Sequence, residues 1–232
     1  IIPLLDVAPS EVMNLVHLLV EKGGEDLAAN QPNAAFRRWC ASDSKRADEI
    51  VSSARASDPL SLRHLVFALE SKGDFQEALR SAKASGEERI AGVLALSRMK
   101  LTLVEAAQAI EYILGIAETS EAKETAGLIK AALDMAGKHE DLDRAQFAEA
   151  FNRTTASDCP ITVHLMASAV HMHLGQMCPE EVEICLKGIL EVNPENRGTI
   201  REIDSALRRL WKINPQQAGQ VAAKLISRTE GT

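Results

Sequence analysis

The sequence predicts an all-α fold, a right-handed α-solenoid in which about 13 helices pack as successive antiparallel pairs. Three observations predict it: a repeated helix start, dense helix-boundary signals, and the lack of any β-strand pattern. The repeat is a residue able to start a helix, followed four positions later by a small or short apolar one. The six pairs are Asp43 and Ala47, Asp74 and Ala78, Thr102 and Ala106, Asp141 and Ala145, Cys178 and Val182, and Asn214 and Ala218. Their starts are 31, 28, 40, 36 and 36 residues apart, which is typical of helical repeats.

Six helices are expected in the first part of the chain, over 10–22, 25–40, 43–56, 59–72, 74–85 and 87–99. Pro32 is expected to split the second of them. Asp58 before Pro59 provides a cap and a first-turn proline for the fourth. Gly73 and Gly86 follow apolar periodic runs, as glycines at helix C-termini do.

Seven more helices are expected over 102–116, 119–137, 142–153, 160–174, 178–192, 194–212 and 215–228. Apolar residues at helical spacing support 119–137 and 178–192, and Asn-Pro steps start the last two at Pro194 and Pro215. The segment 161–174 is apolar almost all round, so we expect other helices to cover it on more than one side.

The composition fits a globular protein that buries a core. The 232 residues are 46% apolar but only 3% aromatic, so the core must be mainly aliphatic. The net charge of −7 argues against a polyanionic partner, which needs a basic surface. We therefore expect one helical-repeat domain over 1–232, with a protein or peptide partner rather than a nucleic acid, and with no membrane span.

The four cysteines, Cys40, Cys159, Cys178 and Cys185, form no CxxC motif and fit free thiols in a reducing, cytoplasmic compartment. The sequence opens at Ile1 and its first methionine is Met13, so we expect a piece of a longer protein.

Two stretches resemble the tetratricopeptide repeat, a family of paired antiparallel helices of about 34 residues. They are Leu65 to Ala82, with Gly73-Asp74-Phe75-Gln76-Glu77-Ala78-Leu79 at the turn, and His164 to Asn196, which closes with Asn193-Pro194-Glu195-Asn196. Gly73, Ala78, Ala106, Ala218 and Pro194 match the small-residue and turn positions of the family's motif. The resemblance implies a protein-binding solenoid.

The sequence also departs from that family. The Trp, Gly and Tyr of its first helix are absent, Glu149 stands where an apolar residue is expected, and the repeat length varies. A HEAT-type array explains the sequence nearly as well, and a closed helical bundle is a third alternative.

No motif indicates a reaction, and we predict no catalytic, cofactor-binding or metal-ligating residue. His164, His171 and His173 lie near Cys159, Cys178 and Cys185, a set with zinc-binding atoms. However, the seven-residue spacings place His164 about 10.5 Å along a helix from His171, and Cys178 equally far from Cys185, too far for one ion. Buried core residues explain this set better.

Each tryptophan lies near basic residues, Trp39 beside Arg37 and Arg38, and Trp211 beside Arg208 and Arg209. Such groupings are typical of interface hot spots, while packing of each tryptophan on the core under arginine stems is the alternative. The leading hypothesis is a non-catalytic module that binds a protein or peptide on a solenoid surface. A nucleic-acid-binding repeat domain is the second, and an all-α enzyme the third.

Overall fold

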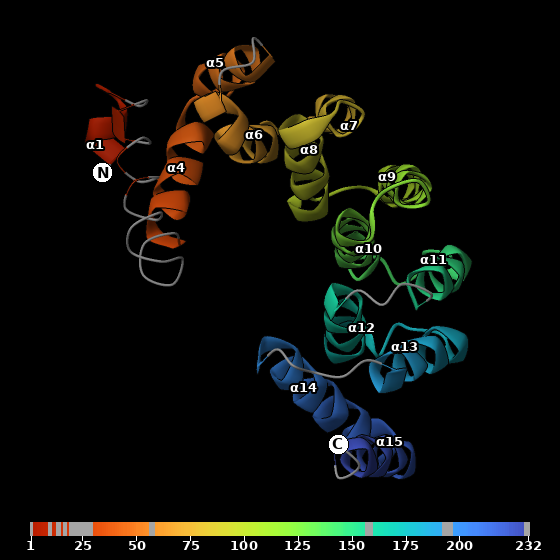
Figure 1. Ribbon diagram of the computed structural model, residues 1–232. Coiled ribbons are helices and arrows are strands. Elements are labelled where there is room, and N and C mark those ends of the chain that lie inside the picture. Colours follow the sequence, from red (N-terminus) through yellow and green to blue (C-terminus); the bar gives the residue numbers. More distant parts are fainter. Residues whose placement is uncertain are drawn as a thin grey trace. The chain divides into compact units, whose positions relative to one another are not determined.

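The computed structural model describes residues 2–8, 11–12, 15, 18, 30–55, 59–155, 160–191 and 197–229. Within these ranges the regular structure consists of 13 helices and no strand (Figure 1), which confirms the predicted all-α class. None of these described helices is both long and apolar enough to cross a membrane. The chain divides into two compact units, Ile1–Leu101 and Thr102–Thr232. The expectation of a single domain stays a prediction.

The helices of the first unit are α1 (Ile2–Leu5), α4 (Asn30–Ser42), α5 (Ser44–Arg55), α6 (Pro59–Lys72), α7 (Phe75–Ala82) and α8 (Gly86–Arg98). The helices of the second are α9 (Leu103–Ala117), α10 (Ala122–Ala136), α11 (Ala145–Thr155), α12 (Pro160–His173), α13 (Pro179–Glu191), α14 (Arg197–Ile213) and α15 (Pro215–Thr229). From α5 onward the predicted helices correspond one to one to the observed helices.

Side-chain caps fix several of the predicted helix starts. The Asp74 carboxylate accepts a hydrogen bond from the Glu77 N–H at 3.0 Å, and Thr102 and Glu105 form a reciprocal capping box. The Asn214 side-chain oxygen accepts from the Gln217 N–H at 3.1 Å. Each cap satisfies a donor that the first turn of a helix leaves without an intrahelical partner. Gly73, at a φ of 64°, ends α6 in the left-handed conformation that glycine permits.

The predicted start at Asp141 was wrong. Helix α11 begins at Ala145, where Asp143 accepts a hydrogen bond from the Ala145 N–H at 3.0 Å. Because the start moves along the chain, Ala145 is exposed, and Phe147 and Ala148 fill the core instead. The other small residues of the repeat pattern lie in the core at Ala47, Ala78, Ala106 and Ala218, whereas Val182 is half-buried.

Two expectations near the N-terminus have different outcomes. The expected helix 10–22 lies mostly outside the described residues. Elsewhere in the chain, the expected cap and turn residues Asp58, Asn193 and Pro194 also lie outside them. The expected helix 25–40 is described from Asn30, and Pro32 lies in the first turn of α4, which removes the predicted interruption of that helix. The short helix α1 had no sequence signal.

The helices of each unit contact one another in an alternating order. In the second unit α10, α12 and α14 contact in succession, and α9, α11, α13 and α15 form a parallel succession beside them (Figure 1). In the first unit α4, α6 and α8 contact in succession, with α5 packed on α6 and α7 on α8. Helix α12 contacts α10, α11, α13 and α14, which confirms that its all-round apolar surface is covered on more than one side.

Candidate interaction surface

The two tryptophans lie in opposite environments. Trp39 is 5% exposed in the last turn of α4, whereas Trp211 is 58% exposed in the last turn of α14. Both precede a short connection with a capping residue, Asp43 before α5 and Asn214 before α15. The core interpretation therefore holds for Trp39, and Trp211 presents a large aromatic surface to solvent.

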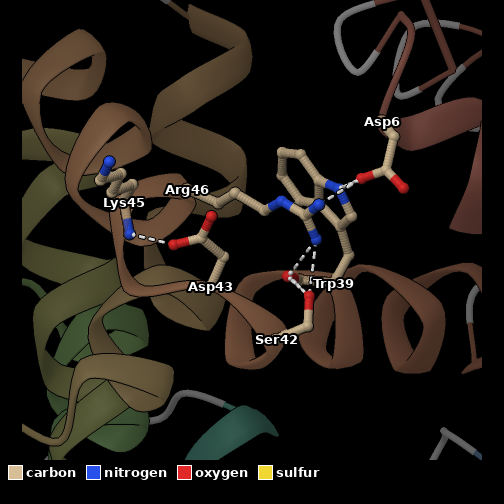
Figure 2. A network of polar contacts seen from close by, with 6 residues as sticks. All are labelled: Asp6, Trp39, Ser42, Asp43, Lys45 and Arg46. Atoms are coloured by element: carbon tan, nitrogen blue, oxygen red, sulfur yellow. Dashed lines mark hydrogen bonds and ion pairs between the residues drawn. The ribbon is translucent and has the colours of Figure 1, made fainter.

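The N-terminal segment covers Trp39 (Figure 2). The indole Nε1–H donates to Asp6 Oδ1 at 2.8 Å, and the Arg46 guanidinium pairs with the same oxygen at 2.5 Å. The guanidinium carbon of Arg46 lies 5.1 Å from the centre of the indole ring, a cation–π distance. Beside Asp6, the Leu5 side chain is fully buried. Asp6 thus binds both members of a tryptophan–arginine grouping.

Further polar contacts hold Arg46 in this position. Its Nη1 donates to Ser42 Oγ at 2.6 Å and to the Trp39 carbonyl oxygen at 3.3 Å (Figure 2). Arg37 pairs with Glu70 on α6 at 3.3 Å and lies over the Phe67 ring. Arg37 and Arg46 are therefore both engaged in contacts within their own unit.

The basic residues near Trp211 lie at the surface. Arg208 pairs with Asp204 on the same helix at 2.9 Å, while Arg209 and Lys212 are exposed and form no ion pair with the described residues. An ideal Cβ built at Gly219 would lie 3.9 Å from Cζ3 of Trp211, so one edge of the indole rests on α15. We call the group Arg208, Trp211 and Lys212, which lie on one side of α14, the Trp211 surface.

Charge is strongly segregated onto this helix pair. Helices α14 and α15 together carry seven basic and two acidic residues, a net charge of +5. Since the whole chain carries −7, the rest of the sequence carries −12. The neighbouring helix α13 contains four glutamates and one lysine. The Trp211 surface is therefore a local basic patch on an acidic chain.

The histidines and cysteines considered as zinc ligands lie apart. His164 is exposed, His171 faces Glu202 on α14 at 3.2 Å, and His173 faces Asp134 on α10 at 3.4 Å. Cys185 is buried, Cys178 is half-buried, and Cys159 lies outside the described residues. No group of three or more metal-binding side chains forms within the described part of the chain.

The two histidines instead connect α12 to both neighbouring even-numbered helices. Burial raises the pKa of Asp134, but hydrogen bonds from His173 and Lys130 outweigh burial and hold that pKa below its usual value. Lys130 Nζ lies 2.8 Å from Asp134 Oδ2.

A buried ion pair joins α11 to α13. Both Glu181 oxygens accept hydrogen bonds from Arg144, at 2.9 and 3.1 Å, and Glu181 also accepts from the Cys178 N–H at 2.7 Å. Glu181 is fully buried, and the Arg144 guanidinium lies 5.0 Å from the centre of the Phe147 ring. Burial also raises the pKa of the nearby Cys185 thiol, so this thiol stays neutral. These contacts hold α11 against α13, and the buried Nη1 of Arg144 has no hydrogen-bond partner among the described residues.

Sequence reasoning found the Trp211 grouping but missed the contact of Asp6 with Trp39. The contact joins residues 33 positions apart, and an isolated aspartate gives no signal of such a partner.

No family model matches the chain, and comparisons with curated proteins and with solved structures gave no match either.

Proposed function

We propose that the chain is a non-catalytic protein–protein interaction module, a cytoplasmic scaffold element that binds a peptide or partner domain on a solenoid surface. Its helices would form a right-handed α-solenoid of antiparallel pairs, of the tetratricopeptide or HEAT type. The alternating contact order supports this architecture, because each helix pair buries its apolar faces against the pairs before and after it.

The single observation that carries the function is the Trp211 surface. Tryptophan and arginine are enriched in interface hot spots, and they combine here with 58% exposure of the indole. Trp39, which is buried, shows that this chain is able to cover a tryptophan in the last turn of another helix. Exposure of Trp211 is therefore a property of that site rather than of the fold.

Selection from an unbiased peptide library displayed on phage tests this function. We expect the wild-type chain to enrich peptides that bind it saturably when resynthesised, at one or more surfaces. A selection that enriches no binding peptide, together with turnover of a substrate by the purified chain, would contradict the proposal.

Nucleic-acid binding is the second candidate, and the +5 charge of α14 and α15 is the observation in its favour. It predicts binding of single strands or duplexes that weakens steeply as salt increases. Fluorescence anisotropy with labelled oligonucleotides at low salt distinguishes the two candidates, since the interaction module predicts no binding there.

A further inference from the structure

We propose that the side of α14 that faces away from α12 binds an amphipathic helix of a partner protein, one whose apolar stripe has carboxylates along one edge. This inference rests on the proposed function, and it specifies the partner's chemistry and the face that binds it. The face carries three apolar residues of α14, Ile200, Leu207 and Trp211, which we call the α14 stripe.

The α14 stripe lies on the side of its helix opposite α12. Its members are spaced i, i+7 and i+11, a spacing that places them on one face of a helix. Glu202 marks the side toward α12, because its carboxylate lies 3.2 Å from His171. Trp211 follows Glu202 by about two and a half helical turns, so the indole lies on the opposite side of α14.

The same stripe is present on α12, where it is buried. The two helices begin at Pro160 and Arg197, so their positions correspond at an offset of 37 residues. The residues of α12 that correspond to the α14 stripe are Val163, Val170 and Leu174. All three are buried, and His171, which faces α14, directly follows one of them. On α12, therefore, this side of the helix lies toward the next helix of the succession, α14.

On α14 the corresponding side is exposed. Ile200 is 48% and Trp211 58% exposed, while Leu207 is half-buried. Apolar surface continues onto α15, because Gly219 lies beside the indole and Ile226, about two turns further along, is 58% exposed. Exposed apolar surface of this kind marks interaction sites. Since a helix lies against this position on α12, a helix is the occupant that fits the same position on α14.

Charge specifies which helix fits. A basic residue directly follows each member of the α14 stripe, namely Arg201, Arg208 and Lys212. Successive positions are about 100° apart around a helix, so these cations form a row along one edge of the stripe. Arg208 pairs with Asp204 at 2.9 Å, whereas Arg201 and Lys212 form no ion pair with the described residues. Carboxylates along the matching edge of a partner helix would pair with these two cations.

Other occupants fit this face less well. A second copy that presented its own α14 and α15 would bring two charges of +5 together. A nucleic acid or an anionic membrane would meet the Asp204 carboxylate, which lies one turn after Ile200 on the same side of the helix. A helix that confines its carboxylates to one edge avoids both repulsions.

The experiment uses the full chain and a fluorescein-labelled synthetic helix of about 18 residues, long enough to follow the α14 stripe. Leucines at i, i+4, i+7 and i+11 form its apolar stripe, and glutamates occupy one edge beside them. A second peptide carries lysines in place of these glutamates. We expect saturable binding of the glutamate peptide in fluorescence anisotropy, and a blue shift of the Trp211 emission with the unlabelled peptide. The lysine peptide should bind at least about 10-fold more weakly.

Two exposed isoleucines of α14 provide matched variants. Ile200→Ser should weaken binding of the glutamate peptide about 5- to 10-fold, and Trp211→Ala about 10- to 30-fold. Ile213 is 59% exposed but lies about 200° around the helix from Trp211, so Ile213→Ser should change binding less than about 2-fold. Equal effects of the two isoleucine variants would indicate adhesion without a defined site and would overturn the proposal. Equal binding of the two peptides, or no binding of the glutamate peptide, would overturn it as well.

Other outcomes separate this inference from the proposed function. Failure of the glutamate peptide, while library-selected peptides bind the wild type, Ile200→Ser and Trp211→Ala equally, would overturn the inference and leave the function standing. Displacement of the glutamate peptide by a single-stranded oligonucleotide would overturn both. Displacement by phosphatidylserine vesicles would identify a membrane as the occupant, and sedimentation dimers that Ile200→Ser abolishes would identify a second copy. Either result would overturn the inference.

Discussion

Gly92 lies where α7 and α8 approach each other closely, and replacing it tests the packing directly. An ideal Cβ at Gly92 would lie 2.2 Å from the Ala82 backbone nitrogen, 2.6 Å from the Ser81 carbonyl carbon and 2.8 Å from the Ala82 Cα. Ordinary contacts begin near 3.4 Å, so α7 and α8 would have to separate by about 1.2 Å at this point. All three atoms belong to backbone and have no rotamer through which to move away.

We expect Gly92→Ala to destabilise the first unit by about 2 kcal/mol. Overpacking of a rigid contact costs about 3 kcal/mol, at the upper end of its usual range, and the higher helix propensity of alanine offsets about 1 kcal/mol of it. Urea unfolding followed by circular dichroism measures the loss. Hydrogen exchange should place the weakened amides in α7 and α8.

Gly127 is the matched control. It also lies inside a helix, α10, but a Cβ there would meet no atom within 4 Å. Gly127→Ala should therefore stabilise the chain by about 0.5–1 kcal/mol through helix propensity alone. A Gly92→Ala variant as stable as Gly127→Ala would refute the close approach of α7 and α8.

Three further predictions concern a cap, a surface pair and a buried pair. Asn214→Ala should lower the free energy of unfolding by about 1 kcal/mol in urea titrations, because the first turn of α15 loses its cap. Asp134→Asn should remove a stabilisation that the wild type has above the unfolded pKa of the carboxyl, near 4, and loses as pH falls through the lower folded pKa. The curves of unfolding free energy against pH for the two proteins should therefore converge in acid. A constant gap between the curves would contradict the contact with His173. Glu181→Ala should cost about 3–5 kcal/mol by leaving Arg144 buried without its partner, and the double variant with Arg144→Ala should recover part of that loss in thermal unfolding.

Local signals predicted most of the helices. Asp74, Thr102 and Asn214 each mark a start that the structure confirms with a side-chain cap, because capping depends on residues only three positions apart. The start of α11 was mispredicted because the pattern selects Asp141, which has Ala145 four positions later, whereas Asp143 is the residue that binds the first helical N–H.

Local sequence signals did not predict the long-range contacts. The sequence placed each tryptophan beside basic residues, but their opposite exposures depend on what else packs there. Trp39 is covered by Asp6 from 33 residues away, and the Arg144–Glu181 pair joins residues 37 apart. Such pairings depend on how the helices stack. The residue pattern predicts the order of the helices along the chain but not the side-chain contacts between them.

Cross-linking between even-numbered helices tests the stacked arrangement most directly. The account predicts that cysteine pairs replacing Asp134 and His173, on α10 and α12, and replacing His171 and Glu202, on α12 and α14, are bridged readily by a short bifunctional thiol reagent, since the tips of the native side chains lie 3.4 and 3.2 Å apart. Mass spectrometry identifies each link and separates it from links to the native thiols. A pair replacing Asp134 and Glu202 should stay unlinked, and its cross-linking as fast as the other two would contradict the array and favour a closed bundle.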